Sequence, residues 1–277
     1  MTAIALALGA SLCWGTGDFL GGIGARRLAT LTVLAVSAFA GLLAVAVLVA
    51  VQGNAPPPAG SVALAAAAGL MGAVGLGALF RGMAVGAIAV VAPISSAAAV
   101  IPVVFGLATG DRPSGLQLAG MAVVLAGVAL ASREPSAAGR RLAAGVPLAL
   151  LAALGFGLYF LLMDPASDDG ALWAVLVARS AATLAATAVA VVLRSGLPRA
   201  ADLPLLATVG IFDASANAML AVALTKGLVG VVAVLSSLYP VVTVLLARAV
   251  LGERVARAQR TGVVLALGGV AVIAAGS

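Results

Sequence analysis

Long apolar runs separated by short polar connections make up most of this chain. A window of about twenty residues, the length that a helix needs to cross the hydrocarbon core of a bilayer, finds ten such runs. They lie at residues 4–23, 30–51, 61–79, 85–109, 116–131, 144–163, 172–193, 203–224, 229–250 and 261–275. Because a helix satisfies its own backbone hydrogen bonds in lipid, the pattern predicts an all-α integral membrane protein with ten transmembrane helices.

The connections between these runs concentrate Pro, Gly and charged residues, which end helices. They read "QGNAPPPAGS" (52–61), "TGDRPSG" (109–115), "SREPSAAGRR" (132–141), "MDPASDDG" (163–170), "RSGLPRAAD" (194–202) and "LGERVARAQR" (251–260). We therefore expect Asp164, Asp168 and Asp169 to lie together in one loop. The first run has no basic segment before it and no small-x-small cleavage site after it, which favours a permanent helix over a signal peptide.

Composition supports a membrane protein and removes several classes of chemistry. With 64% hydrophobic and 9% charged residues, the chain has too little polar surface to coat a soluble globule, so we expect a multi-pass protein of the cell membrane. The 15 Lys and Arg are scattered, which argues against a nucleic-acid partner. The chain has no histidine and a single cysteine, Cys13, so no intrachain disulfide and no His-based metal site can form.

The sequence also repeats itself. A shift of 142 residues places "GDRPSGLQLAGMAVVLAGVA" (110–129) on "GERVARAQRTGVVLALGGVA" (252–271), and the shared Gly, Arg and Gln positions are hard to match by chance. A shift of 141 places Ser95 and Ser96 on Ser236 and Ser237. We therefore predict a first five-helix repeat at 1–132, a linker at 133–143 and a second five-helix repeat at 144–277.

An odd number of helices in each repeat has a topological consequence. The second copy must enter the membrane upside down relative to the first, and inverted repeats of this kind are typical of transporters with a central site between the copies. Basic residues concentrate in the odd-numbered connections, whereas the even-numbered ones hold only Arg112 and Lys226. By the positive-inside rule, this distribution would place both termini outside the cell.

Several stretches together resemble the drug/metabolite transporter superfamily, in particular its ten-helix members with two EamA-type domains. They are "LCWGTGDFLGG" (12–22), "GAIAVVAPISSAAAVIPVVFGLATGDRPS" (86–114), "GLVGVVAVLSSLYPVVTVLLARAVLGERV" (227–255) and the pair "AGMAVVLAGVAL" and "TGVVLALGGVAV". The resemblance implies a secondary transporter of small metabolites, often an exporter, with a substrate cavity between the halves. It also implies cytoplasmic termini, against the distribution of basic residues, so the orientation stays open.

Asp213 and Asn217 lie four residues apart in the eighth run and so share one helix face. An ionisable side chain at bilayer depth costs at least about 2.5 kcal/mol, so Asp213 should face protein or water. It could couple transport to protons or pair with a cationic solute; the alternative is a static ion pair, for example with Arg179. Arg179 could in turn serve an anionic solute or anchor two helices.

Further candidates lie in corresponding helices of the two halves. Trp14 and Asp18 sit on a small, polar face of the first run, which could line a cavity or serve close helix packing. Phe156 and Tyr159 in the matching sixth run could contact an organic solute or simply pack. The serine pairs Ser95-Ser96 and Ser236-Ser237, the latter followed by Tyr239 and Pro240, predict kinks, where binding sites and hinges tend to fall.

Four glycines form a last pattern. Gly120 and Gly127, and likewise Gly262 and Gly269, are seven residues apart on one helix face, which predicts tight helix contact rather than a binding site.

The function that these observations favour is a secondary transporter that exports a small organic metabolite by alternating access. Its partners would be the solute, the bilayer and, as a further option, protons, with no cofactor, no metal and no enzyme activity. No Gly-x4-Gly-Lys-Ser/Thr loop is present to bind ATP. The alternatives are an intramembrane enzyme acting on a lipid or isoprenoid substrate, for which Asp164, Asp168 and Asp169 would be a weak metal site, and a helical scaffold.

Overall fold

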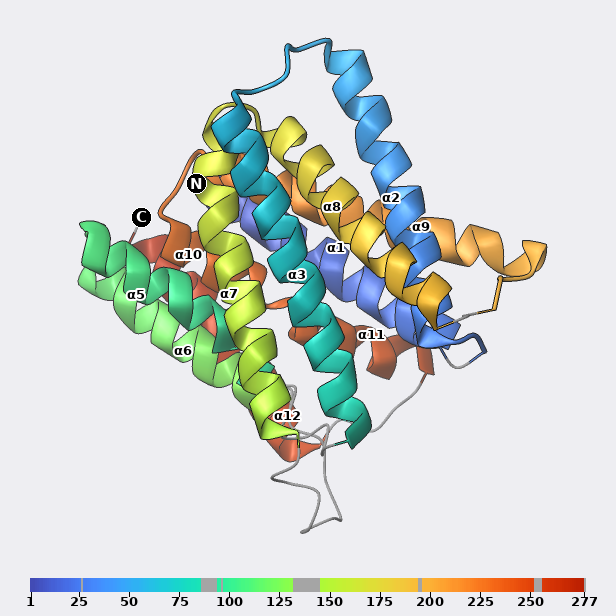
Figure 1. Ribbon diagram of the computed structural model, residues 1–277. Helices are drawn as coiled ribbons and strands as arrows, with labels where there is room; N and C mark the ends of the chain where they lie inside the picture. The colour runs from blue at the N-terminus through green and yellow to red at the C-terminus, as the bar shows by residue number, and fades with distance from the viewer. Residues whose placement is uncertain are drawn as a thin grey trace.

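A computed structural model of the protein describes residues 1–25, 27–85, 94–95, 97–131, 145–193, 196–251 and 256–276. Every regular element in these residues is a helix (Figure 1). The elements of the first half are α1 (Thr2–Ala25), α2 (Thr30–Gln52), α3 (Ala59–Val85), η1 (Ala97–Ala99), α5 (Val100–Thr109) and α6 (Gly115–Ala131). Those of the second half are α7 (Val146–Asp168), α8 (Ala171–Val192), η2 (Ala200–Asp202), α9 (Leu203–Leu224), α10 (Val229–Ser236), α11 (Tyr239–Leu251) and α12 (Arg257–Ala275).

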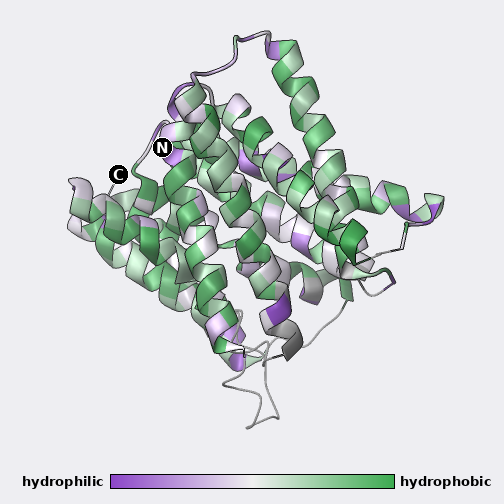
Figure 2. Ribbon diagram, viewed as in Figure 1, coloured by the Kyte–Doolittle hydropathy of each residue, from purple (hydrophilic) through white to green (hydrophobic). Residues whose placement is uncertain are grey.

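The described residues contain eight helices that are long and apolar enough to cross a membrane, counting 229–251 as one, and two shorter apolar helices at 97–109 and 115–131. Figure 2 shows helices coloured mostly as hydrophobic, with the more hydrophilic residues in the connections, at several helix ends and at a few places inside the bundle. The prediction of an all-helical membrane protein is confirmed. Ser96, the whole linker at 133–143 and residues 86–93 of the fourth run lie outside the described residues.

One predicted loop is wrong. α7 continues to Asp168, so Asp164 and Asp168 lie in its last turns and only Asp169 lies in the turn that follows. Pro165 is inside this helix although it cannot donate a backbone hydrogen bond, a defect that membrane helices tolerate. The helix therefore outlasts the apolar run, which ends at Met163.

Contacts between the two halves come in matching pairs: a contact of one helix recurs when the two halves are exchanged. α1 packs on α9 and its counterpart α7 packs on α3; α2 packs on α9 and its counterpart α8 packs on α3. Counterparts also meet directly, namely α2 with α8 and α6 with α12, and the halves meet again where α1 packs on α11 and α5 on α10. In Figure 1, α7 rises from the lower end of the bundle whereas α3 descends towards it.

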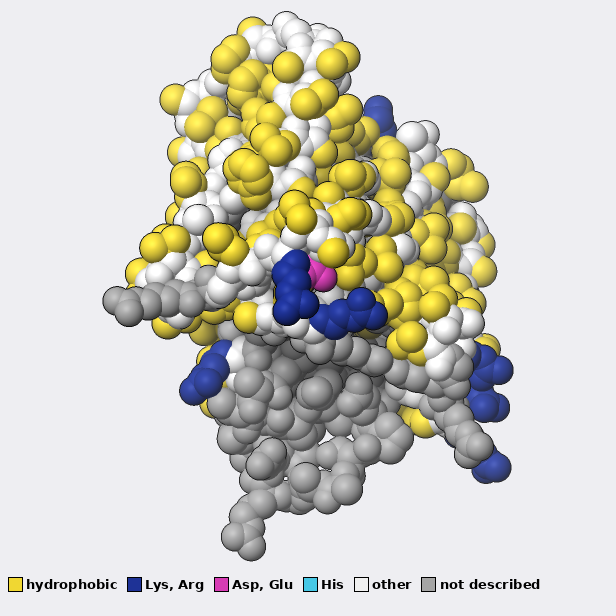
Figure 3. All heavy atoms as spheres, turned by 90° about the vertical axis from the view of Figure 1, so that its right-hand side faces the viewer, with side chains coloured by type: hydrophobic (Ala, Val, Ile, Leu, Met, Phe, Trp, Pro, Cys, Tyr) yellow, Lys and Arg dark blue, Asp and Glu magenta, His cyan; other side chains and the backbone are white. Residues whose placement is uncertain are grey.

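Small side chains fill the interior and large apolar ones lie outside. The core is mostly alanine and valine, whereas Phe39, Val47 and Val51 on α2 are more than half exposed. This distribution suits a bilayer, because lipid tails are as apolar as leucine and helices associate through close packing of small residues. Figure 3 shows one face of the molecule largely covered by hydrophobic side chains.

A close helix contact lies between α6 and α12, where the four predicted glycines meet. A Cβ atom on Gly269 would lie 2.8 Å from the carbonyl oxygen of Gly120, and one on Gly120 would lie 2.8 Å from that of Gly269. Gly127 and Gly262 approach each other's carbonyl oxygens in the same way. The predicted tight contact is therefore present, and it joins the last described helix of each half.

The starts of these two helices are capped alike. The side chain of Gln117 accepts a hydrogen bond from the backbone N–H of Ser114 at 2.8 Å, and that of Gln259 accepts one from Ala256 at 2.9 Å. This is the return bond of a capping box, in which a Gln reaches back to the residue before the helix. Gln117 and Gln259, which the repeat alignment pairs, thus form the same capping hydrogen bond in both halves.

Helix breaks also fall at corresponding places. In the second half, α10 ends at Ser236 and α11 starts at Tyr239, with a turn at Ser237 and Leu238. In the first half, the 3-10 turn η1 precedes α5, which starts at Val100. Both interruptions lie at the serine pairs, where the sequence predicts kinks.

Candidate functional site

A charged side chain lies near the middle of α9 and is held from two other helices. A carboxylate oxygen of Asp213 accepts a hydrogen bond from the Arg179 guanidinium of α8, with 2.5 Å between Nη1 and Oδ2. Its other oxygen, Oδ1, accepts a hydrogen bond from the indole Nε1 of Trp14 on α1 at 2.9 Å. Asp213 therefore joins α1 of the first half to α8 and α9 of the second.

Asn217, one turn further along α9, extends this network to a fourth helix. Its amide nitrogen donates to the backbone oxygen of Asp213 at 2.7 Å and to its Oδ1 at 3.1 Å. Its amide oxygen accepts a hydrogen bond from the phenol of Tyr159 on α7. Every polar atom of the Asn217 side chain is thereby engaged, and the four helices are tied through one residue pair.

The two charges of the network differ in exposure. The side chain of Arg179 is 8% exposed, whereas that of Asp213 is 43% exposed. A buried guanidinium requires a counter-charge, and Asp213 supplies it. Because much of Asp213 stays accessible, its carboxylate can also be reached by something other than Arg179.

Arg179 fits between helices because Gly41 leaves room for its guanidinium. A Cβ atom on Gly41 of α2 would collide with the guanidinium and with the backbone oxygen of Gly210 on α9. The Nε of Arg179 is buried without a hydrogen-bond partner, as is the hydroxyl of Thr183 one turn along α8. The arginine thus keeps an unused donor, which is costly in a dry environment.

Aromatic rings surround the Trp14 end of the network. The ring of Trp14 meets Phe160 of α7 edge-on, with centroids 6.5 Å apart, and Tyr239 of α11 with centroids 6.3 Å apart. Tyr159 and Phe160 also meet edge-on at 6.0 Å. Edge-to-face pairs of this kind are among the favourable arrangements for aromatic rings.

Asp18 lies one turn beyond Trp14 on α1 and is exposed. This part of α1 lies against both α9 and α11, because a Cβ atom on Gly17 would lie 3.9 Å from the Asp213 backbone nitrogen and one on Gly15 would lie 2.7 Å from the Tyr239 backbone oxygen. α11 approaches α1 closely here, since Gly15 packs on Val242 and the hydroxyl of Thr243 donates to the Gly15 backbone oxygen at 3.1 Å.

The serines at the helix breaks have separate surroundings. The hydroxyl of Ser237 donates to the backbone oxygen of Val234 at 2.8 Å, a bond back to its own helix. The hydroxyl of Ser236 is buried with no partner, and Ser95 is buried as well. Among the described residues, neither Ser236 nor Ser237 has a hydrogen bond to the Asp213 network, and Ser96 lies outside the described residues.

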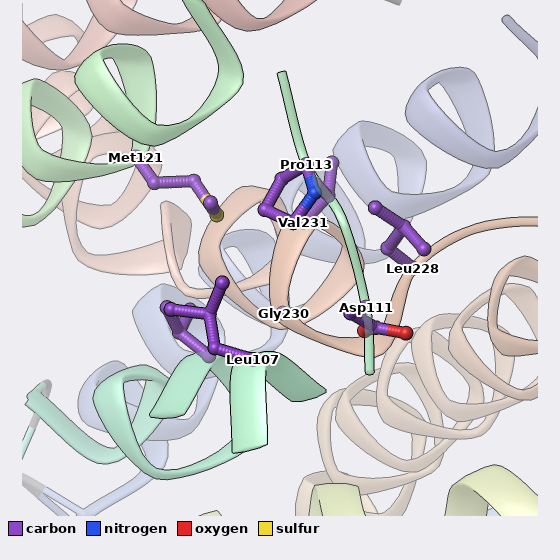
Figure 4. Close-up of a pocket in the computed structure, with 8 residues that line it drawn as sticks. Leu107, Asp111, Pro113, Met121, Leu228, Gly230 and Val231 are labelled. Atoms are coloured by element: carbon purple, nitrogen blue, oxygen red, sulfur yellow. The ribbon is translucent and has the colours of Figure 1, made fainter. Parts of the chain in front are cut away.

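Two pockets lie elsewhere. One, shown in Figure 4, is enclosed by α5, the α5–α6 connection and the start of α10, and its volume of about 10 Å³ is roughly that of one water molecule. Asp111 and Met121 lie at its wall. The other is an apolar groove of about 530 Å³ between η1 with α5 and α7, lined by residues such as Ile101 and Leu154.

The acidic residues at the end of α7 do not form a metal site in the part of the chain that the structure describes. No group of three or more His, Cys, Asp or Glu side chains there is placed to hold a metal ion. Asp169 instead accepts a hydrogen bond from Ser61 of α3 at 2.5 Å.

The sequence-predicted residues thus fall into two groups. The structure brings together Asp213, Asn217, Arg179, Trp14 and Tyr159 by hydrogen bonds, with Tyr239 and Asp18 beside them. Sequence reasoning missed Phe160 and Gly41; Phe160 is one residue from Tyr159, but nothing in the sequence ties Gly41 to Arg179. It considered Phe156, which packs on Gly75 instead.

Comparison with known proteins adds a family to this geometry. The profile of the EamA-like transporter family matches residues 1–133 and 143–275. A comparison with curated proteins finds no match. A solved structure titled "Crystal structure of protein" is similar, with a TM-score of 0.81 and 18% sequence identity, covering 98% of this chain and 95% of that chain. At that identity the similarity concerns the fold alone.

Proposed function

Because the chain belongs to the EamA-like transporter family, we propose that it is a secondary transporter that exports a small organic metabolite by alternating access. The observation that carries this proposal is the half-exposed Asp213, which is held by Arg179 and by Trp14 of the opposite half. No observation favours the alternative of an intramembrane enzyme.

The proposed architecture is ten spans arranged as two inverted five-helix repeats, 1–132 and 144–277. Three features support it: the contacts of α1 with α9 and of α3 with α7, the matching caps at Gln117 and Gln259, and the helix breaks at corresponding serine pairs. Each feature occurs twice, at positions that the shift of 141 or 142 residues relates to one another. In inverted repeats, the solute site lies near the midplane, where the halves meet.

The proposed solute site consists of Asp213, Asn217, Trp14, Tyr159, Asp18, Tyr239 and Arg179, with the serine pairs Ser95, Ser96, Ser236 and Ser237 at the adjoining hinges. Asp213 lies eleven residues into the 22-residue α9, so it would be near the bilayer midplane. Each repeat contributes to the site, since Trp14 comes from α1 and Asp213 from α9. Rocking of the halves would therefore change the distances between the hydrogen-bonding groups.

A carboxylate shared between an arginine and an accessible space can exchange partners. In one state Asp213 pairs with Arg179, as seen here; in another, a solute or a proton would compete for its exposed oxygen. Binding of the solute or proton would then depend on opening of the ion pair. Asp213 would have a partner of opposite charge, or a proton, at every stage. The breaks at Ser237–Leu238 and at η1 supply points where α10–α11 and α5 can bend.

Transport by reconstituted protein tests this proposal. Proteoliposomes with the purified protein inserted in both orientations should accumulate or release a solute that first emerges as a stabilising ligand in a thermal-shift screen of metabolites. Asp213→Asn should abolish this transport or remove its dependence on a pH gradient while the protein still folds. The matched control is Asp202→Asn at the start of α9, outside the network, which should transport normally.

Unchanged transport by Asp213→Asn between pH 5 and 8 would remove Asp213 from the mechanism. If the protein binds metabolites but transports none of them in either orientation, the transport function itself fails.

A further inference from the structure

We propose that the transported solute is an organic cation and that Asp18 binds its charge beside the rings of Trp14 and Tyr239. This inference rests on the transport function proposed above and names the chemical class of its solute. It is argued from the balance of charge and of hydrogen bonds at the centre of the bundle.

The described ionisable side chains at this place are two acids and one base. Arg179 and Asp213 neutralise each other in an ion pair. Asp18 is left over, because no described residue forms an ion pair with it. The site therefore carries one uncompensated negative charge.

Hydrogen bonding shows the same imbalance. Asp213 receives three side-chain donors, from Arg179, Trp14 and Asn217. Asp18 receives no hydrogen bond from any described residue that the structure records, and it is exposed. Its carboxylate is therefore the one available to an incoming group.

The position of Asp18 makes the lack of a partner energetically unfavourable. It lies seven residues before Ala25, the end of α1, which is about 10 Å along the helix axis at about 1.5 Å per residue. A bare carboxylate within a transmembrane segment is unfavourable, and such residues normally pair with a partner or line a wet cavity. A cation supplies the missing charge, whereas an anion would add to the excess.

The positive charge of Arg179 does not make the site suitable for an anion. One of its nitrogens is already bound to Asp213, and its unpartnered Nε is buried beyond the reach of a solute. An anionic solute would have to break the ion pair with Asp213 to gain a partner, and it would then leave Asp213 uncompensated.

The rings beside Asp18 suit an organic rather than an inorganic cation. Trp14 lies one turn before Asp18 on α1 and meets Tyr239 of α11 edge-on at an interplanar angle of 74°. Aromatic faces attract ammonium groups through their quadrupole, and tryptophan does so best. An alkylammonium would place its charge at Asp18 and its carbon atoms against the rings.

Thermal unfolding of the purified full chain tests the charge preference directly. The panel consists of organic monocations, each with a neutral and an anionic isostere; choline, 3,3-dimethyl-1-butanol and 3,3-dimethylbutanoate form its first triplet. Cations should raise Tm in a concentration-dependent way and their isosteres should not, because only a ligand that binds the folded state stabilises it. A panel in which no cation stabilises the protein, or in which anions do, overturns the inference.

Asp18→Asn tests the residue. With the tightest cation of the panel, Kd should rise at least about tenfold in Asp18→Asn, recover in part in Asp18→Glu and stay unchanged in the control Asp202→Asn. Tyr239→Leu should weaken binding severalfold while Tyr239→Phe, which keeps a ring, should not; this pair decides the matter if Asp18→Asn fails to fold. If both Asp18→Asn and Tyr239→Leu bind the cation as tightly as the unchanged protein does, the assignment is overturned.

The two proposals fail in different ways. Transport of a neutral or anionic solute in proteoliposomes would refute the cationic class and keep the transporter. Absence of transport for every ligand that binds would refute the transporter and leave the cation site standing as a binding site.

Discussion

The two halves of the molecule are joined in two contrasting ways. Between α6 and α12, glycines bring the backbones together along most of the contact, and the Ser114 hydroxyl donates a hydrogen bond to the Gly276 backbone oxygen at one end of it. Around Asp213, side chains from α1, α7, α8 and α9 are joined by hydrogen bonds and an ion pair, and the acid remains 43% exposed. A packed glycine contact has only one good arrangement, whereas a polar network can exchange its partners. We therefore expect the first region to carry stability and the second to carry function.

The largest effect is expected from Arg179→Met, which leaves Asp213 without its counter-charge. Removing one partner of a buried ion pair typically costs about 3–5 kcal/mol, and the exposure of Asp213 should reduce the loss here to about 2 kcal/mol. Transport should fall by at least about a hundredfold. Chemical unfolding in detergent and transport in proteoliposomes measure the two losses.

The double variant Arg179→Met with Asp213→Asn separates the loss of stability from the loss of transport. It removes both charges, so stability should return to near that of the unchanged protein while transport stays lost. Recovery of transport as well would show that the ion pair is only structural.

Gly269→Ala should destabilise the protein by about 1–3 kcal/mol, the usual cost of overpacking. The added Cβ would lie 2.7 Å from a methyl group of Val124 and 2.8 Å from the Gly120 carbonyl oxygen, and backbone cannot move aside cheaply. Its neighbour Gly268 has no atom within 4 Å of such a Cβ, so Gly268→Ala is the matched control. Solute affinity of the folded protein should be unchanged in both.

If Gly268→Ala costs as much as Gly269→Ala, the loss comes from glycine content and not from the contact with α6. If Gly269→Ala changes solute affinity strongly, the division between a packed region and a functional one is wrong.

Tyr159→Phe should lower stability by about 1 kcal/mol, because the amide oxygen of Asn217 loses its donor. Solute affinity should fall a few fold. Thr208→Val is a matched control on α9, since its hydroxyl bonds only the Pro204 backbone oxygen of the same helix, at 2.8 Å, and is exposed. Equal effects on affinity from both variants would exclude Tyr159 from the network's function.

The smallest effects should come from the helix caps. Gln117→Ala and Gln259→Ala each remove one return hydrogen bond, of 2.8 and 2.9 Å, at the start of α6 and α12. Loss of such a cap costs about 0.5 kcal/mol at the low end. Thermal unfolding of the two variants should give shifts of similar size; a large effect in one alone would speak against equivalent halves.

Much of the fold could be predicted from the sequence because the bilayer fixes the length of an apolar helix. Nine of the ten runs correspond to described helices at nearly the expected residues, and the fourth is described only from Ile94 onward. The failure at Asp164 and Asp168 has a local reason: proline and acid mark loops in soluble proteins, but a membrane helix can pass through Pro165 and emerge into water with its acids.

The site could be predicted only in part. Arg179 and Asp213 are among the few charges within apolar runs, so their pairing was a natural alternative from sequence. The hydrogen bond from Trp14 to Asp213 joins residues 199 positions apart and depends on how α1 is rotated against α9, which no local pattern encodes. The same holds for Gly41, whose role is to leave space for a side chain two helices away.

The central claim is that the halves are inverted copies that meet at Asp213, and labelling of paired connections tests it most directly. In a Cys13→Ala background, Asn54→Cys in the α2–α3 connection and Leu197→Cys in the matching α8–α9 connection each place a thiol at an exposed residue. Arg112→Cys is the control expected on the same side of the membrane as Asn54→Cys. Arg27→Cys is the control expected on the same side as Leu197→Cys. Intact vesicles are treated with a membrane-impermeant maleimide before and after permeabilisation.

The account predicts that Asn54→Cys and Arg112→Cys label from one side of the membrane and that Leu197→Cys and Arg27→Cys label from the other. Labelling of Asn54→Cys and Leu197→Cys from the same side would contradict the inverted arrangement and with it the central site.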